Sequence, residues 1–365
     1  MRYLYYCNST YQLLNVLNLH WHRSNAGFEN IPDYKADLVL LNTFEGADQI
    51  ADIIKKMNVF ERVFLMNKTY NKGRLHGIKT LLDAVSPVFY MRDKHKMDKS
   101  VFYNRYDVIS APKYSILIDE IWRLNKKAYL DLFEDGTASY HLVIPMEPNS
   151  ARVEKIREFL HVNSFRDYKH LYLVSKALYA GKDEYKVVEI PAFDKGYLNA
   201  LRTAFASFGH YPNDKKIYWL SQFLNNHDFN VMVDELLSIL SEYKEDVLFC
   251  QHPRKYLENV YQFEETDGKQ IWEIQMLNMQ DVDKKLFISI HSTACFTAKM
   301  LYDMEPYVIL FYKLGDPIVT AVTDEFEHSI ELFKNSYRDP SKVMIPENIE
   351  EFKACLKNYM SLVKD

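Results

Sequence analysis

Several sequence features that define large protein classes are absent or scarce. The 365 residues include only four cysteines, which are far apart and form no CxxC pair. This pattern favours free thiols in a reducing compartment over a disulfide framework. The ten glycines form neither GxGxxG nor a P-loop motif, and no GxSxG is present. NAD-type binding, P-loop binding and an α/β-hydrolase nucleophile therefore lack support.

The sequence also lacks signals for export or for crossing a membrane. Residues 1–14, MRYLYYCNSTYQLL, have neither a basic flank nor a small-residue cleavage site. No run of about 18 uncharged apolar residues occurs. The net charge of −5 argues against a nucleic-acid partner. We expect a cytoplasmic protein; peripheral attachment to the inner face of the membrane and a homodimer both stay open.

What is present is a regular alternation of strands and helices. Hydrophobic residues make up 48% of the chain, as in a globular protein, and the length suits two domains. Apolar runs predict strands at residues 2–8, 36–43, 62–67, 106–112, 128–136, 215–222, 246–253, 286–293 and 306–313. Helical periodicity occurs at residues 10–22, 46–58, 72–85, 114–125, 149–162, 229–243, 270–278, 294–304 and 347–363. The alternation predicts two successive doubly wound parallel sheets, with ligands outside the carboxyl ends of the strands.

The alternation breaks near Pro191, which ends a strand. This break predicts an N-terminal domain at residues 1–192 and a hinge at residues 193–213. A second Rossmann-like domain is expected at residues 214–345, followed by a C-terminal helix at residues 346–365. We expect the active site in a cleft between the two domains.

The first polar strand end is Glu134-Asp135-Gly136. The glycine relieves steric crowding, so that the following helix can begin close by. Two adjacent carboxylates repel each other, which should raise the pKa of one of them toward the range of a general base. The alternative interpretation is an acidic N-cap that only opens the next helix.

Three other strand ends carry polar residues. His252-Pro253 follows one apolar run, and the proline favours an extended conformation at His252, which fixes its direction. Ser292-Thr293 precedes a predicted helix, whose N-terminus favours phosphate. The segment 9–12 follows the first strand in the same way. Backbone capping remains the alternative for each of them.

Together these strand ends resemble the motif set of bacterial sialyltransferases, and the surrounding residues are most similar to glycosyltransferase family 52. The segments LFEDGTASY, FCQHPRKY and ISIHSTACF resemble its three blocks, in order and at comparable separations. The segment YYCNSTYQLL is similar to its first strand. The resemblance covers nearly the whole chain, from the first strand to the last block.

This resemblance implies a GT-B fold and inverting transfer of sialic acid from CMP-sialic acid to a galactoside-type acceptor of a bacterial surface glycan, with no metal or other cofactor. Asp135 would take the proton of the acceptor hydroxyl. His252 would stabilise or protonate the departing phosphate. Glu134 would tune Asp135 or orient the acceptor, and Asp228 is a second-ranked match to a base.

Further residues are expected to bind the substrates. The expected donor-binding residues are Ser292, Thr293, Pro253, Glu273, Ser221 and Gln222. The expected acceptor-binding residues are Ser9, Thr10, Gln12 and Gly136. Two alternative functions stay open: a GT-B glycosyltransferase that uses another nucleotide sugar, such as a UDP-sugar, in capsule or exopolysaccharide synthesis, and a non-catalytic scaffold that binds a nucleotide sugar.

Overall fold

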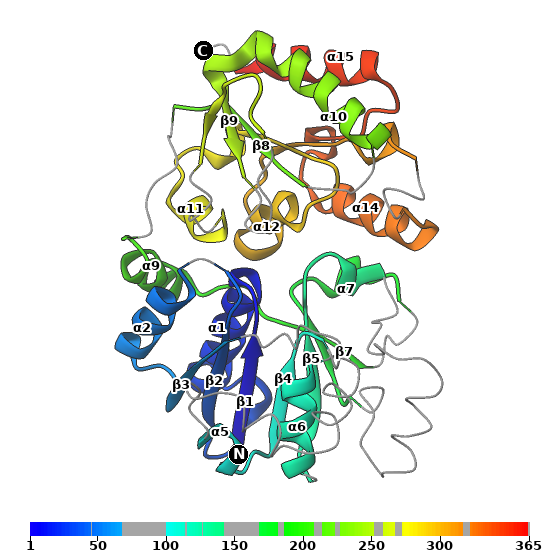
Figure 1. Ribbon diagram of the computed structural model, residues 1–365. Coiled ribbons are helices and arrows are strands. Elements are labelled where there is room, and N and C mark those ends of the chain that lie inside the picture. Colours follow the sequence, from blue (N-terminus) through cyan, green and yellow to red (C-terminus); the bar gives the residue numbers. More distant parts are fainter. Residues whose placement is uncertain are drawn as a thin grey trace, which may run out of the picture. The chain divides into compact units, whose positions relative to one another are not determined.

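The computed structural model shows two α/β units, each built on one parallel sheet (Figure 1). Unit 1 comprises Met1–Lys176 and Lys182–Pro191, and unit 2 comprises Ala177–Gly181 and Ala192–Asp365. The structure describes residues 1–44, 46–67, 100–113, 115–125, 127–141, 168–181, 186–207, 214–222, 227–251, 258–266, 272–316 and 322–363.

The sheet of unit 1 has the strand order β3-β2-β1-β4-β5-β6-β7, and all of its pairings are parallel. Its strands are β1 (Arg2–Cys7), β2 (Lys35–Asn42), β3 (Arg62–Asn67), β4 (Val108–Ala111), β5 (Tyr129–Phe133), β6 (Leu171–Leu173) and β7 (Val187–Glu189). The strands β1 to β5 match the apolar runs that predict them. The sequence pattern does not predict β6, because its three residues are too few to show a period.

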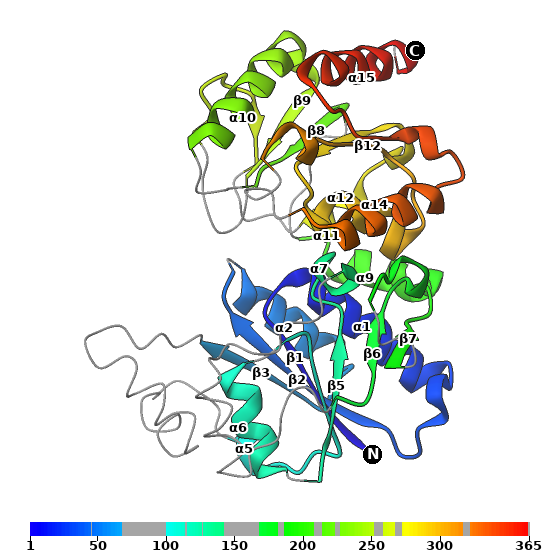
Figure 2. The ribbon, with the colours of Figure 1, turned by 90° about the vertical axis from the view of Figure 1, so that its right-hand side faces the viewer.

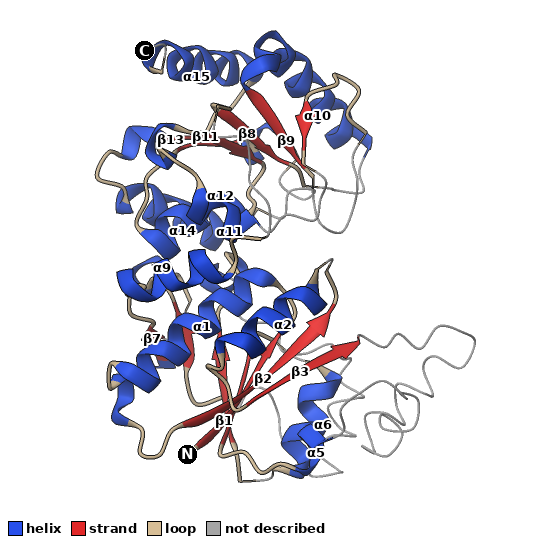
Figure 3. Cartoon of the chain, turned by 90° about the vertical axis from the view of Figure 1, so that its left-hand side faces the viewer, coloured by secondary structure: helices blue, strands red, loops and turns tan. Residues whose placement is uncertain are grey.

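Helices cover both faces of this sheet. The helices of unit 1 are α1 (Thr10–Asn25), α2 (Ala47–Met57), α5 (Ser100–Tyr103), α6 (Ile116–Leu124) and α7 (Ala138–His141), of which α7 lies at the carboxyl end of β5. A 3-10 turn follows α1 at Phe28–Asn30, and another, Lys176–Leu178, spans the boundary with unit 2. From β1 the chain passes through α1 to β2, and from β4 it passes through α6 to β5 in the opposite direction along the sheet. Since such crossovers are right-handed, α1 and α6 lie on opposite faces (Figures 2 and 3). The helices predicted at residues 72–85 and 149–162 lie outside the described residues.

The sheet of unit 2 has the order β10-β9-β8-β11-β12-β13 and is also parallel. Its strands are β8 (Ile217–Leu220), β9 (Val247–Cys250), β10 (Glu264–Glu265), β11 (Leu286–Ser289), β12 (Tyr307–Leu310) and β13 (Val343–Met344). The four longer strands match their predicted runs. The two-residue strands β10 and β13 are not predicted.

Unit 2 contains the helices α9 (Lys195–Ala204), α10 (His227–Leu240), α11 (Trp272–Asn278), α12 (Thr293–Tyr302), α14 (Asp324–Ser336) and α15 (Ile349–Leu362). Its 3-10 turns are Ser241–Asp246, Val282–Lys284, Tyr312–Leu314 and Pro340–Lys342. In Figure 1, α10 and α15 lie on one face of the sheet, and α12 and α14 lie on the other. The helix α9 occupies part of the expected hinge and contacts α11. In the described part of the chain, no helix has the length and apolar character to cross a membrane.

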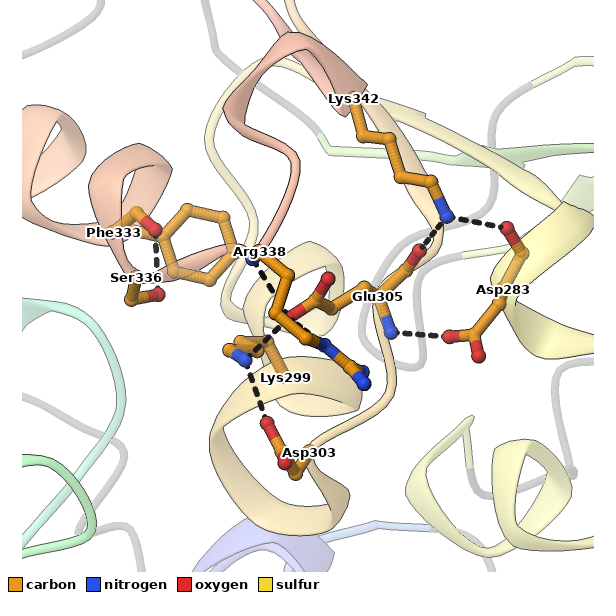
Figure 4. Close-up of polar contacts among 8 residues, drawn as sticks. All are labelled: Asp283, Lys299, Asp303, Glu305, Phe333, Ser336, Arg338 and Lys342. Carbon is orange, nitrogen blue, oxygen red and sulfur yellow. Dashed lines mark hydrogen bonds and ion pairs between the residues drawn. The ribbon is translucent and has the colours of Figure 1, made fainter.

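A group of charged residues joins the amino-terminal edge of the second sheet to its helices (Figure 4). Glu305, just before β12, accepts bonds through Oε1 from Lys299 Nζ at 2.6 Å and from Arg338 N and Nε, each at 3.1 Å. Lys342 Nζ donates to the backbone oxygens of Asp283 and Glu305 at 3.0 and 2.9 Å. Burial alone would raise the pKa of Glu305, but the bonds from Lys299 and Arg338 lower it to about 2. This Glu305 network (Asp283, Lys299, Asp303, Glu305, Arg338 and Lys342) stabilises the start of β12.

Candidate active site

The polar cluster of unit 1 lies at the carboxyl ends of three adjacent strands, β1, β4 and β5. The chain leaves β1 and β4 in opposite directions along the sheet, so this is the switch point where doubly wound sheets bind ligands. The segment Ser9–Gln12 follows β1, Lys113 follows β4, and Glu134–Gly136 follows β5. The structure therefore brings together residues that are more than a hundred positions apart in the sequence.

Glu134 is fully buried, and three donors reach its carboxylate. The hydroxyl of Tyr11 donates to Oε1, and the Tyr140 hydroxyl and the Val174 backbone N–H donate to Oε2 at 2.5 and 3.0 Å. Burial raises the pKa of Glu134 to about 7, although these three bonds oppose the rise. The charge of Asp135 adds a minor upward effect. The rise in pKa predicted for this carboxylate pair thus occurs at Glu134, and its main cause is burial rather than repulsion.

Asp135 is the more accessible carboxylate of the pair, with a side chain that is 25% exposed. Its Oδ1 accepts a hydrogen bond from Gln12 Nε2, and its Oδ2 accepts one from Lys113 Nζ at 2.6 Å. Its backbone N–H donates to Ser139 Oγ at 2.9 Å. Because each carboxylate oxygen has two lone pairs, Asp135 can still accept a hydrogen bond from a substrate hydroxyl.

The start of α1 supports this arrangement. Ser9 is the N-cap of α1, and its side chain accepts a bond from the backbone N–H of Gln12 at 3.3 Å. Thr10 is the first residue of the helix. The Gln12 amide oxygen accepts a bond from the backbone N–H of Asn8 at 2.8 Å, as in a capping box shifted by one residue. Acceptor contacts for Ser9, Thr10, Gln12 and Gly136 stay predictions.

The accessible carboxylate and the buried carboxylate suit different tasks. Asp135 can touch a substrate and take a proton from a hydroxyl. Glu134 has no exposed surface, so it acts only through its neighbours: it joins α1, β5, α7 and the residue after β6 through Tyr11, Tyr140 and Val174. Glu134 thereby fixes the segment that carries Asp135.

A second cluster lies at the carboxyl ends of β8 and β11, the switch point of the second sheet. The amide oxygen of Gln222 accepts bonds from Ser289 Oγ and from the backbone N–H of His291, each at 3.2 Å. Ser221 is buried, and its hydroxyl donates to the backbone oxygen of Cys250 at 2.8 Å. This bond holds the end of β8 against the end of β9.

The structure describes some of the remaining predicted catalytic and donor-binding residues and not others. Ser292 is the N-cap of α12 and accepts a bond from Ala294 N at 3.3 Å, and Thr293 begins this helix. Glu273 is half-buried on α11, and its backbone oxygen accepts a bond from the Tyr302 hydroxyl at 3.2 Å. Asp228 is exposed in the first turn of α10. His252 and Pro253 lie outside the described residues.

Sequence analysis alone does not find Lys113, Tyr11 or Tyr140 as members of the first cluster. The signal for Lys113 is its position directly after the predicted strand at residues 106–112. Using that signal requires knowing that β4 lies between β1 and β5, because only this order places Lys113 beside Asp135. Tyr11 and Tyr140 lie inside the motif segments YYCNSTYQLL and LFEDGTASY, but many tyrosines in this chain are core residues, so neither is singled out as a site residue.

Comparison with solved structures shows which known fold these units form. The glycotransferase of kitacinnamycin matches 99% of this chain and 90% of its own, with a TM-score of 0.51 and 11% identity. The UDP-GlcNAc 2-epimerase of Methanocaldococcus jannaschii, in complex with UDP-GlcNAc and UDP, matches 99% of this chain and 93% of its own, with a TM-score of 0.50 and 12% identity. The chain has the GT-B fold. This fold carries both transferases and epimerases, so it does not decide the reaction.

At the level of sequence, no protein-family model and no curated protein matches the chain. Membership of family 52 therefore stays a prediction from the motifs. Within the described part of the chain, no group of three or more histidine, cysteine, aspartate or glutamate side chains is arranged to hold a metal ion.

Proposed function

We propose that this protein is an inverting glycosyltransferase that transfers sialic acid from CMP-sialic acid to a galactoside-type acceptor. The observation that carries the proposal is the state of Asp135: it is a partly open carboxylate at the switch point of a GT-B sheet, and its two oxygens accept bonds from Gln12 and Lys113. A general base for a sugar hydroxyl needs this combination of access and fixed orientation. The resemblance of the three motif blocks supports sialic acid as the transferred sugar.

In the proposed reaction, the acceptor hydroxyl oxygen forms a bond to the anomeric carbon as the bond from that carbon to the phosphate oxygen of CMP breaks. Asp135 takes the hydroxyl proton. His252 donates a proton or a hydrogen bond to the departing phosphate. Hydroxyl and backbone N–H groups at the start of α12, from Ser292 and Thr293, bind its oxygens, where the helix dipole favours negative charge. A single displacement inverts the anomeric centre.

A UDP-sugar is the second candidate donor. The observation that favours it is the match to an epimerase structure that contains UDP-GlcNAc and UDP. Thermal-shift measurements with CMP, CDP, UDP and GDP separate the two candidates, because a bound nucleotide raises the melting temperature of the folded chain. We expect stabilisation by CMP; stabilisation by UDP alone would exclude CMP-sialic acid. Incubation with CMP-sialic acid and a panel of galactosides then tests transfer directly.

The assignment of base and acid is tested by two substitutions. Asp135→Asn and His252→Ala should each lower kcat by about 10²- to 10⁴-fold, the usual contribution of a general acid or base. Matched controls are Asp52→Asn and His328→Ala, which change exposed residues on α2 and α14. Folded variants of Asp135 and His252 that keep wild-type rates would show that these residues have other roles.

A further inference from the structure

We propose that Gln12 is a positioning residue that holds the Asp135 carboxylate, rather than a residue that contacts the acceptor. The inference rests on the proposed function, because it assigns Asp135 a catalytic task. Its starting point is the burial of Gln12, a residue that is 1% exposed. A side chain buried to this degree offers no polar atom to an incoming sugar.

Both polar atoms of this amide already have partners. The Oε1 atom accepts a bond from the Asn8 N–H at 2.8 Å, and Nε2 donates to Asp135 Oδ1. Asn8 is itself tied to the end of β2, because Thr43 Oγ1 donates to its backbone oxygen at 2.8 Å. A continuous chain of hydrogen bonds therefore runs from β2 through Asn8 and Gln12 to the carboxylate.

The two side chains that hold Asp135 differ in how firmly they are fixed. The Lys113 side chain is 46% exposed, and a flexible exposed ammonium restrains its partner weakly. Gln12 lies on α1 and is anchored at its other end, so it fixes the direction of the carboxylate plane. Because small errors in the orientation of a reacting group lower the rate strongly, this restraint should affect kcat.

The substitution Gln12→Glu isolates this contact. It preserves the length of the side chain and the acceptor for the Asn8 N–H, but it replaces the donor to Asp135 with an anionic oxygen. We expect kcat to fall about 100-fold while the acceptor KM stays within about 3-fold of wild type, the pattern of an interaction made through the reacting group. Gln49→Glu makes the same chemical change at an exposed position of α2 and should alter neither constant. A raised acceptor KM with an unchanged kcat would overturn the proposal, since it would indicate direct contact with the acceptor.

A double-mutant cycle gives a second readout that does not need transfer. Gln12→Glu alone should lower the Tm, because two carboxylates then face each other, and Asp135→Asn in the same chain should restore it. In the transfer assay, adding Gln12→Glu to a chain that already carries Asp135→Asn should lower kcat little further. Additive effects in both measurements would overturn the proposal. If wild type transfers no sugar, the proposed function fails, and that result is distinct from a failure of the cycle.

Discussion

Two glutamates, one in each unit, accept the same number of hydrogen bonds, yet the pKa of one is raised and the pKa of the other is lowered. Glu134 and Glu305 both have nearly inaccessible side chains, and each carboxylate accepts three hydrogen bonds. Burial raises the pKa of Glu134 to about 7, whereas the pKa of Glu305 is lowered to about 2 despite its burial. Two features differ: protein surrounds Glu134 more completely than Glu305, and the donors to Glu134 are two tyrosine hydroxyls and one backbone N–H, whereas Lys299 and Arg338 bring positive charge to Glu305. Neutral donors also lower the pKa of a carboxylate, but those around Glu134 do not offset its desolvation, whereas the bonds and charges at Glu305 do.

The two glutamates also lie at opposite ends of their sheets. The Glu305 network is at the amino-terminal edge of the second sheet, where paired charges stabilise the fold. Glu134 is at the carboxyl-terminal edge of the first sheet, next to the carboxylate proposed to react. A positively charged group beside Glu134 would compete with Lys113 for the same region and would change the field around Asp135. The neutral surroundings of Glu134 therefore suit its place in the proposed site.

The largest effect is expected from removing the charge of Glu305. Glu305→Gln leaves Lys299 and Arg338 without their shared partner, and it should lower the free energy of unfolding by about 3 to 4 kcal/mol at pH 7. Urea unfolding measures this loss, with Glu331→Gln on an exposed face of α14 as the control.

The loss should also depend on pH. The folded pKa of Glu305 lies below its ordinary value of 4.5, so its contribution is present above pH 4.5 and disappears as the pH falls toward 2. A difference between wild type and variant that is constant from pH 7 to pH 3 would contradict the ion-pair interpretation.

The contribution of Glu134 to the free energy of unfolding should depend on pH in the opposite direction, and it should be somewhat smaller than that of Glu305. The folded pKa of Glu134 lies above 4.5, so the stability that protonated Glu134 contributes is lost as the pH rises from 4.5 to 7. For a shift of this size the loss is about 2 to 3 kcal/mol. Glu134→Gln cannot titrate, so the unfolding free energy of wild type relative to this variant should fall by that amount over this range. If wild type and variant change in parallel, the raised pKa is not present in solution.

The smallest effect is expected at Lys113, which places one exposed cation beside Asp135. Lys113→Met should lower kcat by about 10-fold or less, because an exposed ion pair restrains its partner by only about 1 kcal/mol. Lys113→Arg should recover most of the rate, and Lys56→Met on α2 is the control for loss of an exposed lysine. A loss as large as that of Asp135→Asn would mean that Lys113 contacts the substrate itself.

The sequence predicts the strands of this fold well where they are long. Runs such as residues 3–7 and 38–41 are apolar throughout because both faces of a parallel sheet are buried, and this pattern favours a strand over a loop. The three-residue strand β6 and the helix α9 escape prediction for different reasons. β6 is too short to show a period, and Gly196 makes the start of α9 look like a linker.

The candidate site is only partly predictable, for reasons of topology. The pair Glu134-Asp135 is visible as two acids after an apolar run, but the sequence does not say which one is buried. That depends on Tyr11 and Tyr140: Tyr140 is only six residues from Glu134, but the Tyr11 hydroxyl approaches only after β1 and β5 are placed in the same sheet. The role inferred for Gln12 has the same origin, since its partner is 123 positions away.

Gly136, directly after the two acids, limits how mutations in this segment can be interpreted. Its φ is 132°, a backbone conformation that residues with a Cβ rarely adopt. An alanine at this position would twist the peptide unit that joins residues 135 and 136. The Asp135 carboxylate would then point in a different direction. An inactive Gly136→Ala protein would thus report on chain geometry and would say nothing about whether a sugar touches residue 136.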